Sequence, residues 1–427
     1  MKKSIKAIAA FTAALTMAIS CVPTIYAADD VPAVQEEAET EAKTGFEFTV
    51  GRTVDAPYNG IAKVADEEGN VYYQGYDSEN DGIIIYTLDE NGSIKNSYTV
   101  ERYVNEKGEK IRLGYDTLKQ CGDDLYLIYT EVFGFSGRAK FIVKLDKELN
   151  EISKNKYPQS INFDTNGEKI VYMTKNNRTI YSMDMDGKNK QVLYTVEQDR
   201  PLDVLNFLAI TGDYVGFQKN EGGSVPKDCK DYCGIIDLKT GEVTFKEQRS
   251  VQQLYESNGK IIWYSSEWRD IRDSYMTTVP EGEDLIDYTI KQNTKEREYF
   301  KDGESYVLDN GKYYVLKTQS YRESHGLTID NDGNVITYSY NNGRYDFKFY
   351  RDNKLIDTYS ADLKGVCGFT ANNGVLTICY DGLDDSQLGD WVTLPPNMSD
   401  AEYEEYLAST PAPKIDYTMK SVTISYK

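Results

Sequence analysis

Apolar and polar residues alternate along most of the chain with the two-residue period of β-strands. The clearest instance is the stretch 179–194, where alternating segments flank the tight turn Asp184-Met185-Asp186-Gly187. Asp and Gly supply the backbone conformations that such a turn needs. This stretch therefore predicts a half-buried antiparallel hairpin.

Variants of this hairpin recur, and their spacing predicts the architecture. Equivalent strand positions fall at residues 72, 126, 172, 215, 263, 314, 337 and 377, which gives successive intervals of 54, 46, 43, 48, 51, 23 and 40 residues. Most intervals match the length of one four-stranded blade of a β-propeller. We predict an all-β propeller of seven four-stranded blades, with six or eight blades as the alternatives.

Two parts of this prediction concern irregular regions. An interval of 23 residues cannot hold four strands, so residues 304–318 are either an extra hairpin or part of the fifth blade. The segments Phe46–Val50 and Val422–Tyr426, at opposite ends of the chain, both alternate as strands. Because open sheet edges promote aggregation, we expect both end segments to complete the last blade.

One short helix is expected inside the last blade. Ser399-Asp400-Ala401-Glu402 forms a capping box, and the helical spacing of the following apolar residues extends to about residue 408, before Pro411. We interpret residues 399–408 as a helical insertion that packs on the ring.

The chain begins with the features of a bacterial secretory signal. Lys2, Lys3 and Lys6 precede an apolar run over residues 7–19, which is too short to span a bilayer as a helix, and small residues follow up to Ala27. We predict a signal peptide over residues 1–27 and therefore a secreted protein.

An alternative processing site lies inside this leader. Ala18-Ile19-Ser20-Cys21 loosely matches a lipoprotein box, in which a lipidated Cys21 would attach the protein to the cell surface. Residues 28–44 are acidic and nearly free of large apolar groups, which predicts a disordered linker. The propeller domain then covers residues 45–427.

Charge limits the kinds of partner. The formal net charge is −21, and it becomes −24 when residues 1–27, with three Lys and no acid, are removed. A field of this sign repels nucleic acid and anionic membranes, so we expect no nucleic-acid partner and no membrane contact except through Cys21. We also expect a monomer.

The cysteines do not form a complete disulfide framework, since five remain after removal of the leader. Cys367 and Cys379 flank the turn Ala371-Asn372-Asn373-Gly374, so they are either a cross-hairpin disulfide or two adjacent thiols. Cys229 and Cys233 could close a small loop, but no second Cys pair or His accompanies them, which disfavours zinc.

The loops divide between the two faces of a propeller. In a blade with strands A to D, the A–B and C–D turns lie on one face, and the B–C loops and the links between blades lie on the other. Short Asn-Gly and Asp-Gly turns fit A–B and C–D, whereas the longer insertions fall in B–C. We expect the B–C face to bind partners, because loops on a rigid scaffold commonly carry function.

Exposed aromatic and arginine side chains in these insertions form the candidate binding surface, since they can stack on sugar rings and pair with carboxylates. They are Phe133, Phe135, Arg138, Tyr232, Trp268, Arg269, Arg272, Tyr275, Tyr321 and Arg322. The alternative is that these aromatic side chains pack the loops onto the ring.

Few catalytic mechanisms are compatible with the residue inventory. His325 is the single histidine of the chain, which excludes metal sites that need two His and leaves one residue for any Ser-His or Cys-His mechanism. The turns at Asp184–Gly187 and Asp330–Gly333 lack the full ligand pattern of an EF-hand, so we interpret them as hairpin turns. We predict no catalytic, cofactor or metal residues, although paired carboxylates are plentiful enough for a glycosidase.

One repeat resembles a known family. Ile180-Tyr181 followed by Asp184-Met185-Asp186-Gly187-Lys188-Asn189-Lys190 is similar to the repeat of TolB-like propellers and, more distantly, of YWTD propellers of lipoprotein receptors. The match is specific over about fifteen residues, and its general pattern covers roughly residues 60–390. The resemblance implies a partner-binding propeller and no shared catalytic set.

The leading hypothesis is a non-catalytic extracellular binding protein that recognises a glycan or a protein through its B–C face. The alternatives are a carbohydrate-active enzyme, a glycosidase or lyase, with Asp or Glu near the central channel, and an envelope-associated adaptor.

Overall fold

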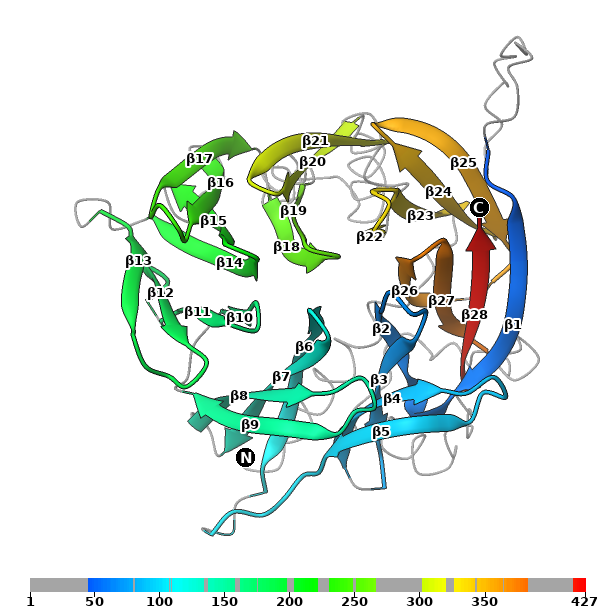
Figure 1. Ribbon diagram of the computed structural model, residues 1–427, viewed down its shortest axis with the longest axis horizontal. Coiled ribbons are helices and arrows are strands. Elements are labelled where there is room, and N and C mark those ends of the chain that lie inside the picture. Colours follow the sequence, from blue (N-terminus) through cyan, green and yellow to red (C-terminus); the bar gives the residue numbers. More distant parts are fainter. Residues whose placement is uncertain are drawn as a thin grey trace, which may run out of the picture.

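The computed structural model of the chain describes residues 45–79, 81–106, 108, 110–133, 137–157, 162–174, 176–197, 203–221, 230–248, 251–265, 302–319, 326–341, 344–363, 365–382 and 418–427. These residues form seven separate four-stranded antiparallel sheets arranged as a ring around a central axis (Figure 1). The predicted seven-bladed β-propeller is therefore confirmed.

Each of the first six blades takes its four strands consecutively from the chain, and the first strand of each lies nearest the axis (Figure 1). The first three blades are β2 (Ile61–Ala65), β3 (Val71–Asp77), β4 (Gly82–Leu88) and β5 (Ile94–Val100); β6 (Arg112–Cys121), β7 (Asp124–Phe133), β8 (Gly137–Leu145) and β9 (Glu151–Tyr157); and β10 (Phe163–Thr165), β11 (Lys169–Met173), β12 (Thr179–Asp184) and β13 (Gln191–Thr195).

The next three blades are β14 (Val204–Thr211), β15 (Tyr214–Glu221), β16 (Lys230–Asp237) and β17 (Val243–Gln248); β18 (Val251–Ser257), β19 (Lys260–Ser265), β20 (Asp302–Asp309) and β21 (Lys312–Gln319); and β22 (Gly326–Ile329), β23 (Val335–Asn341), β24 (Arg344–Arg351) and β25 (Lys354–Ala361). The ambiguous residues 304–318 thus belong to the third and fourth strands of the fifth blade. The interval of 23 residues arose because residue 314 lies on a fourth strand and not on a second strand like residue 337.

The seventh blade closes the ring with both ends of the chain, as predicted. It contains β26 (Val366–Asn372), β27 (Val375–Asp381), β28 (Met419–Tyr426) and, as its outermost strand, β1 (Phe48–Ala56). Phe48 pairs with Tyr426 and Ala56 pairs with Met419. A 3₁₀ turn, η1 (Pro57–Asn59), then carries the chain from this outer strand to β2 at the axis.

Aromatic pairs between the second and third strands recur in the first, second, third and sixth blades. These pairs are cross-strand neighbours whose rings stack 5.1–5.9 Å apart between centroids. They are Tyr73–Tyr86, Tyr129–Phe141, Tyr172–Tyr181 and Tyr338–Phe347. Such pairs stabilise a sheet beyond the area they bury, and here they also fill the space between adjacent blades.

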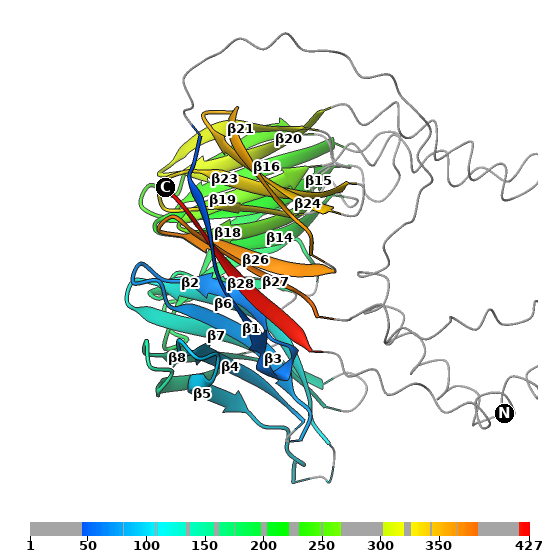
Figure 2. The same ribbon diagram turned by 90° about the vertical axis from the view of Figure 1, so that its right-hand side faces the viewer.

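Two ends of the ring can be distinguished, seen from the side in Figure 2. We call the end that carries the turns after the first and the third strand of each blade the turn end. The crossing end carries the connections between second and third strands and the links from one blade to the next. Asn258-Gly259, Asn310-Gly311 and Asn373-Gly374 at the turn end have positive φ at both residues, as expected for two-residue hairpin turns.

Several predictions fall outside the described residues. They are the signal peptide 1–27 with Cys21, the linker 28–44, the helical insertion 399–408, Cys229 and His325. Cys367 and Cys379 do not form a cross-hairpin disulfide, because a bulge at Cys367 places Gly368 opposite Cys379.

Candidate functional site

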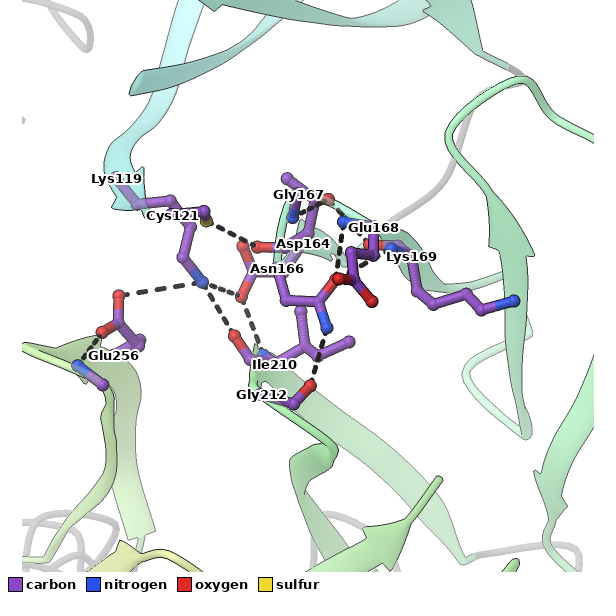
Figure 3. A network of polar contacts seen from close by, with 12 residues as sticks. Lys119, Cys121, Asp164, Asn166, Gly167, Glu168, Lys169, Ile210, Gly212 and Glu256 are labelled. Carbon is purple, nitrogen blue, oxygen red and sulfur yellow. Dashed lines mark hydrogen bonds and ion pairs between the residues drawn. The ribbon is translucent and has the colours of Figure 1, made fainter. Parts of the chain in front are cut away.

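A buried charged network lies on the axis of the ring and joins four blades (Figure 3). Lys119 extends from β6, and its Nζ lies 3.1 Å from Asp164 Oδ2 on β10 and 3.7 Å from Glu256 Oε2 on β18. The three side chains expose 7%, 10% and 14% of their surface. Innermost strands of the second, third and fifth blades are thus connected through one ammonium group.

The same network satisfies the backbone groups of one residue, Ile210, at the open inner edge of the fourth blade. Lys119 Nζ donates a hydrogen bond of 2.8 Å to the Ile210 carbonyl on β14, and the Ile210 N–H donates one of 2.8 Å to Asp164 Oδ2. The innermost strand of a blade has no strand on its axial side, so its backbone groups need other partners. Side chains from neighbouring blades supply them here (Figure 3).

Electrostatics keep this network charged at its centre. Burial alone would lower the pKa of Lys119, but Asp164 and Glu256 outweigh it and hold that pKa above its ordinary value. Burial raises the pKa of the Glu256 carboxyl against the opposing effect of Lys119. Burial also raises the pKa of the neighbouring Cys121 thiol to about 12, so this thiol stays protonated and is a poor nucleophile.

The network does not have the arrangement of a glycosidase centre. Such a centre needs two carboxyl groups about 5–10 Å apart that face a substrate. Asp164 and Glu256 instead both face Lys119, and they also accept hydrogen bonds from the backbone N–H groups of Ile210 and Gly259. The geometry favours a structural role, in which the network fixes the spacing of blades at the axis.

Amide side chains extend this cross-linking around the turn end. Their Nδ2 groups donate to backbone carbonyls of other blades, over distances of 2.5–3.2 Å. The donor and acceptor pairs are Asn166 to Gly212, Asn258 to Ile329 and Ala371, and Asn372 to Ala65. The turn end is therefore held together by bonds between blades.

Aspartates at the turn end stabilise the turns themselves. Asp330 is fully buried, and its carboxylate accepts hydrogen bonds from the Asn334 N–H and Nδ2 at 2.7 Å each and from the Tyr426 hydroxyl at 2.6 Å. Asp66 accepts the same pair of bonds from Asn70. Carboxylates bonded in this way within a turn support the interpretation of Asp330–Gly333 as a hairpin turn.

No group of three or more His, Cys, Asp or Glu side chains within the described ranges is placed to hold a metal ion. Likewise, no helix among these residues is long and apolar enough to cross a membrane.

Exposed large apolar side chains are distributed unevenly in the described part of the chain. Five of them lie on the outermost strands of blades, namely Val50, Ile152, Val192, Phe245 and Leu355. The other five lie at the crossing end, namely Tyr58, Tyr76, Tyr103, Val104 and Tyr340. The described turns of the turn end contribute none.

At the crossing end of the first blade, one carboxylate joins three donors. Asp81, in the connection from β3 to β4, accepts hydrogen bonds from the Tyr76 hydroxyl and from Arg102, and its Oδ2 lies 2.9 Å from Lys110 Nζ. Arg102 and Lys110 belong to the link between the first and second blades. The contact confirms that loops and blade links share one end of the ring.

The structure describes three residues of the predicted binding surface, and it corrects their placement in loops. Phe133 and Arg138 belong to β7 and β8, which continue as a ladder in which Val132 pairs with Arg138. Tyr232 lies on β16 opposite Lys219, half-buried against Phe245, because this hairpin also extends further than expected. Arg138 is exposed and Phe133 packs on the core cluster between the first two blades.

The remaining members of that predicted surface lie outside the described residues. They are Phe135, Trp268, Arg269, Arg272, Tyr275, Tyr321 and Arg322. Sequence reasoning missed Tyr58, Tyr76 and Tyr103, which lie in η1, near the end of β3 and in the link from the first to the second blade rather than in the long insertions. Each of these tyrosines lies within a few residues of the end of a strand, and this position was the signal in the sequence that could have placed them at the surface.

Comparison with known proteins assigns no family to the chain. No family model matches the chain, and no curated protein matches it. Among solved structures, the Cps50 (Swd1) β-propeller domain of Myceliophteria thermophila has a TM-score of 0.44 and 10% identity, over 78% of this chain and 96% of that one. The WD40 domain of SCAP from fission yeast has a TM-score of 0.37 and 9% identity, over 92% and 97%.

An acylaminoacyl peptidase of Pyrococcus horikoshii has a TM-score of 0.39 and 12% identity over 63% of this chain. The match spans 43% of the length of that peptidase. The assignment of a seven-bladed propeller rests on the seven sheets themselves.

Proposed function

We propose that this protein is a secreted, non-catalytic binding protein that holds an extracellular glycan or protein at its crossing end. The observation that carries the proposal is the gathering of exposed tyrosines at that end, while the described turns at the opposite end expose no large apolar side chain. Tyrosine offers a large, rigid surface with a polar tip, which makes it common in binding sites.

The contacts at the turn end also support the proposal. Its amide and carboxylate groups bond to turns and to neighbouring blades, so they are engaged in holding the ring. A rigid scaffold with one end devoted to stability leaves the other end free to vary, which is the usual arrangement of binding propellers.

The secretion of the protein is proposed from its sequence. Lys2, Lys3, Lys6 and the apolar run 7–19 form the predicted signal peptide. Mass spectrometry of the native N-terminus will distinguish cleavage after Ala27 from a lipidated Cys21, and a mature protein that retains Met1 would contradict secretion by this signal.

Binding is tested with the purified mature protein on glycan arrays, on cell-wall fractions and on extracellular proteins of the producing cell. Saturable binding that is lost when the crossing-end tyrosines are replaced supports the proposal. Turnover of a polysaccharide by the wild type, abolished by replacement of one carboxylate, would establish an enzyme instead.

A further inference from the structure

Tyr58 occupies an unusual backbone conformation at the crossing end. It lies in η1, the link between β1 of the seventh blade and β2 of the first, with φ 57° and ψ 24°. The next residue, Asn59, also has positive φ, at 51°. A left-handed conformation is readily adopted by Asn, whereas for a bulky aromatic residue it is strained and frequently associated with function.

The surrounding sequence is adapted to this conformation. The Tyr86 hydroxyl donates a hydrogen bond of 2.6 Å to the Pro57 carbonyl, which also accepts the Gly60 N–H at 3.1 Å. A Cβ at Gly60 would collide with the Tyr86 hydroxyl, and a Cβ at Gly75 would lie 2.8 Å from both Tyr58 Cβ and the Tyr58 carbonyl oxygen. Two glycines and one tyrosine thus accommodate the turn.

The turn presents the Tyr58 ring as the exposed end of an aromatic stack. Its ring meets the Tyr86 ring edge-on with 6.3 Å between centroids, and Tyr86 stacks on Tyr73 at 5.3 Å. Tyr86 and Tyr73 are buried, and the Tyr73 hydroxyl bonds to Ser421 of the seventh blade at 2.9 Å. Tyr58 itself is 39% exposed, so it is both accessible and held in place.

We propose that Tyr58 is the platform of a carbohydrate site that stacks against the apolar face of a neutral pyranose ring. This inference rests on the proposed function and names its ligand class and position. The C–H groups on one face of a sugar ring meet the electron-rich face of an aromatic ring favourably. A ring that is already fixed loses little conformational entropy when the sugar binds.

Two observations favour a neutral sugar over other occupants. The net charge of −21 disfavours anionic polymers. On the turn η1, the large exposed apolar side chain is Tyr58. One ring matches one sugar unit, and the second exposed tyrosine of this blade, Tyr76, lies on β3.

The decisive variant is Tyr58→Asn, measured by isothermal titration calorimetry against cellohexaose, xylohexaose, mannohexaose and chitohexaose and by melting temperature. Asn removes the ring but accommodates the left-handed backbone. We expect the affinity for the sugar that the wild type binds to fall at least about tenfold, which is the loss of one good contact, with no decrease in melting temperature. The matched control is Leu355→Asn, because Leu355 is a large apolar side chain of similar exposure, 47%, but lies on the outermost strand β25 and not at the crossing end.

The outcomes separate the inference from the proposed function. Unchanged sugar affinity in Tyr58→Asn, with a lower melting temperature, would show that Tyr58 is structural and overturn the inference while the binding function stands. Binding of the wild type to an extracellular protein but to none of the four oligosaccharides would overturn it as well. A wild type that binds neither sugars nor extracellular proteins would overturn both.

Discussion

The turn end and the crossing end of this ring use the same residue types for opposite purposes. At the turn end, Asp330 and Asn372 are buried and bonded to neighbouring blades. At the crossing end, Asp81 gathers a tyrosine and two cations near the surface, and Tyr58 is presented on a strained turn. The difference teaches that hydrogen bonds between blades gather at the turn end, while the recognition that we propose uses the opposite end, so mutations at the two ends should have separable effects.

The largest loss of stability is expected for Lys119→Met. Methionine approximates the shape of the lysine stem but leaves Asp164 and Glu256 as buried carboxylates without a cation. Breaking a buried ion pair from one side costs about 3–5 kcal/mol. Urea unfolding will measure the change in the free energy of unfolding.

The control for this prediction is Lys147→Met, since Lys147 is a surface residue that pairs with exposed acids. Its unfolding midpoint should stay close to that of the wild type. Equal midpoints for Lys119→Met and the wild type would show that the axial network does not stabilise the ring.

A somewhat smaller loss is expected for Asp330→Ala at the turn end. The substitution leaves the Tyr426 hydroxyl and the Asn334 amide without their buried acceptor. Orphaned buried polar groups cost about 1–3 kcal/mol each, so we expect a loss of about 2–4 kcal/mol in thermal unfolding. The exposed Asp332 in the same turn provides the control, and Asp332→Ala should melt with the wild type.

The pH dependence of the free energy of unfolding should reveal the raised pKa of the Glu256 carboxyl. Burial raises the pKa of this carboxyl above its value in the unfolded chain, so the folded state binds the proton more tightly. The wild type should therefore gain stability relative to Glu256→Gln as the pH falls from the folded pKa to the lower pKa of the unfolded chain, by about 1.4 kcal/mol in total for each unit of upward shift. Parallel pH profiles for the two proteins would contradict this assignment.

The smallest effect is expected at the crossing end. Val104 is 62% exposed in the link between the first two blades, and Val104→Ser should change the free energy of unfolding by no more than about 0.5 kcal/mol. A loss of 2 kcal/mol or more would show that the crossing end also stabilises the ring, which would break the comparison.

The repeating part of the fold could be predicted from the sequence because each blade is local. Alternation around Asp184–Gly187 predicts β12 and β13, and the Asn-Gly turns predict their own geometry. The fifth blade was ambiguous because the connection between β19 and β20 is long enough to disrupt the interval.

The candidate sites could not be predicted in the same way. Lys119, Asp164 and Glu256 come from three blades, and each alone has the sequence signature of a solvent-exposed charge. Only the closed ring brings them to the axis. Pro57-Tyr58-Asn59-Gly60 predicts a turn, but its residues do not reveal that Tyr58 itself takes the left-handed conformation.

The closure of the seventh blade also fixes the orientation of anything attached to the protein. The N–H and C=O groups of Glu47 and Lys427 exchange hydrogen bonds of 2.9 and 3.3 Å, and Tyr426 bonds to Gly374 at the turn end. Glu47 and Lys427 therefore both lie on the side of the ring away from Tyr58. A tether fused after Lys427 will hold the tyrosine-bearing side outward from a support, so immobilised protein should keep the proposed recognition surface accessible.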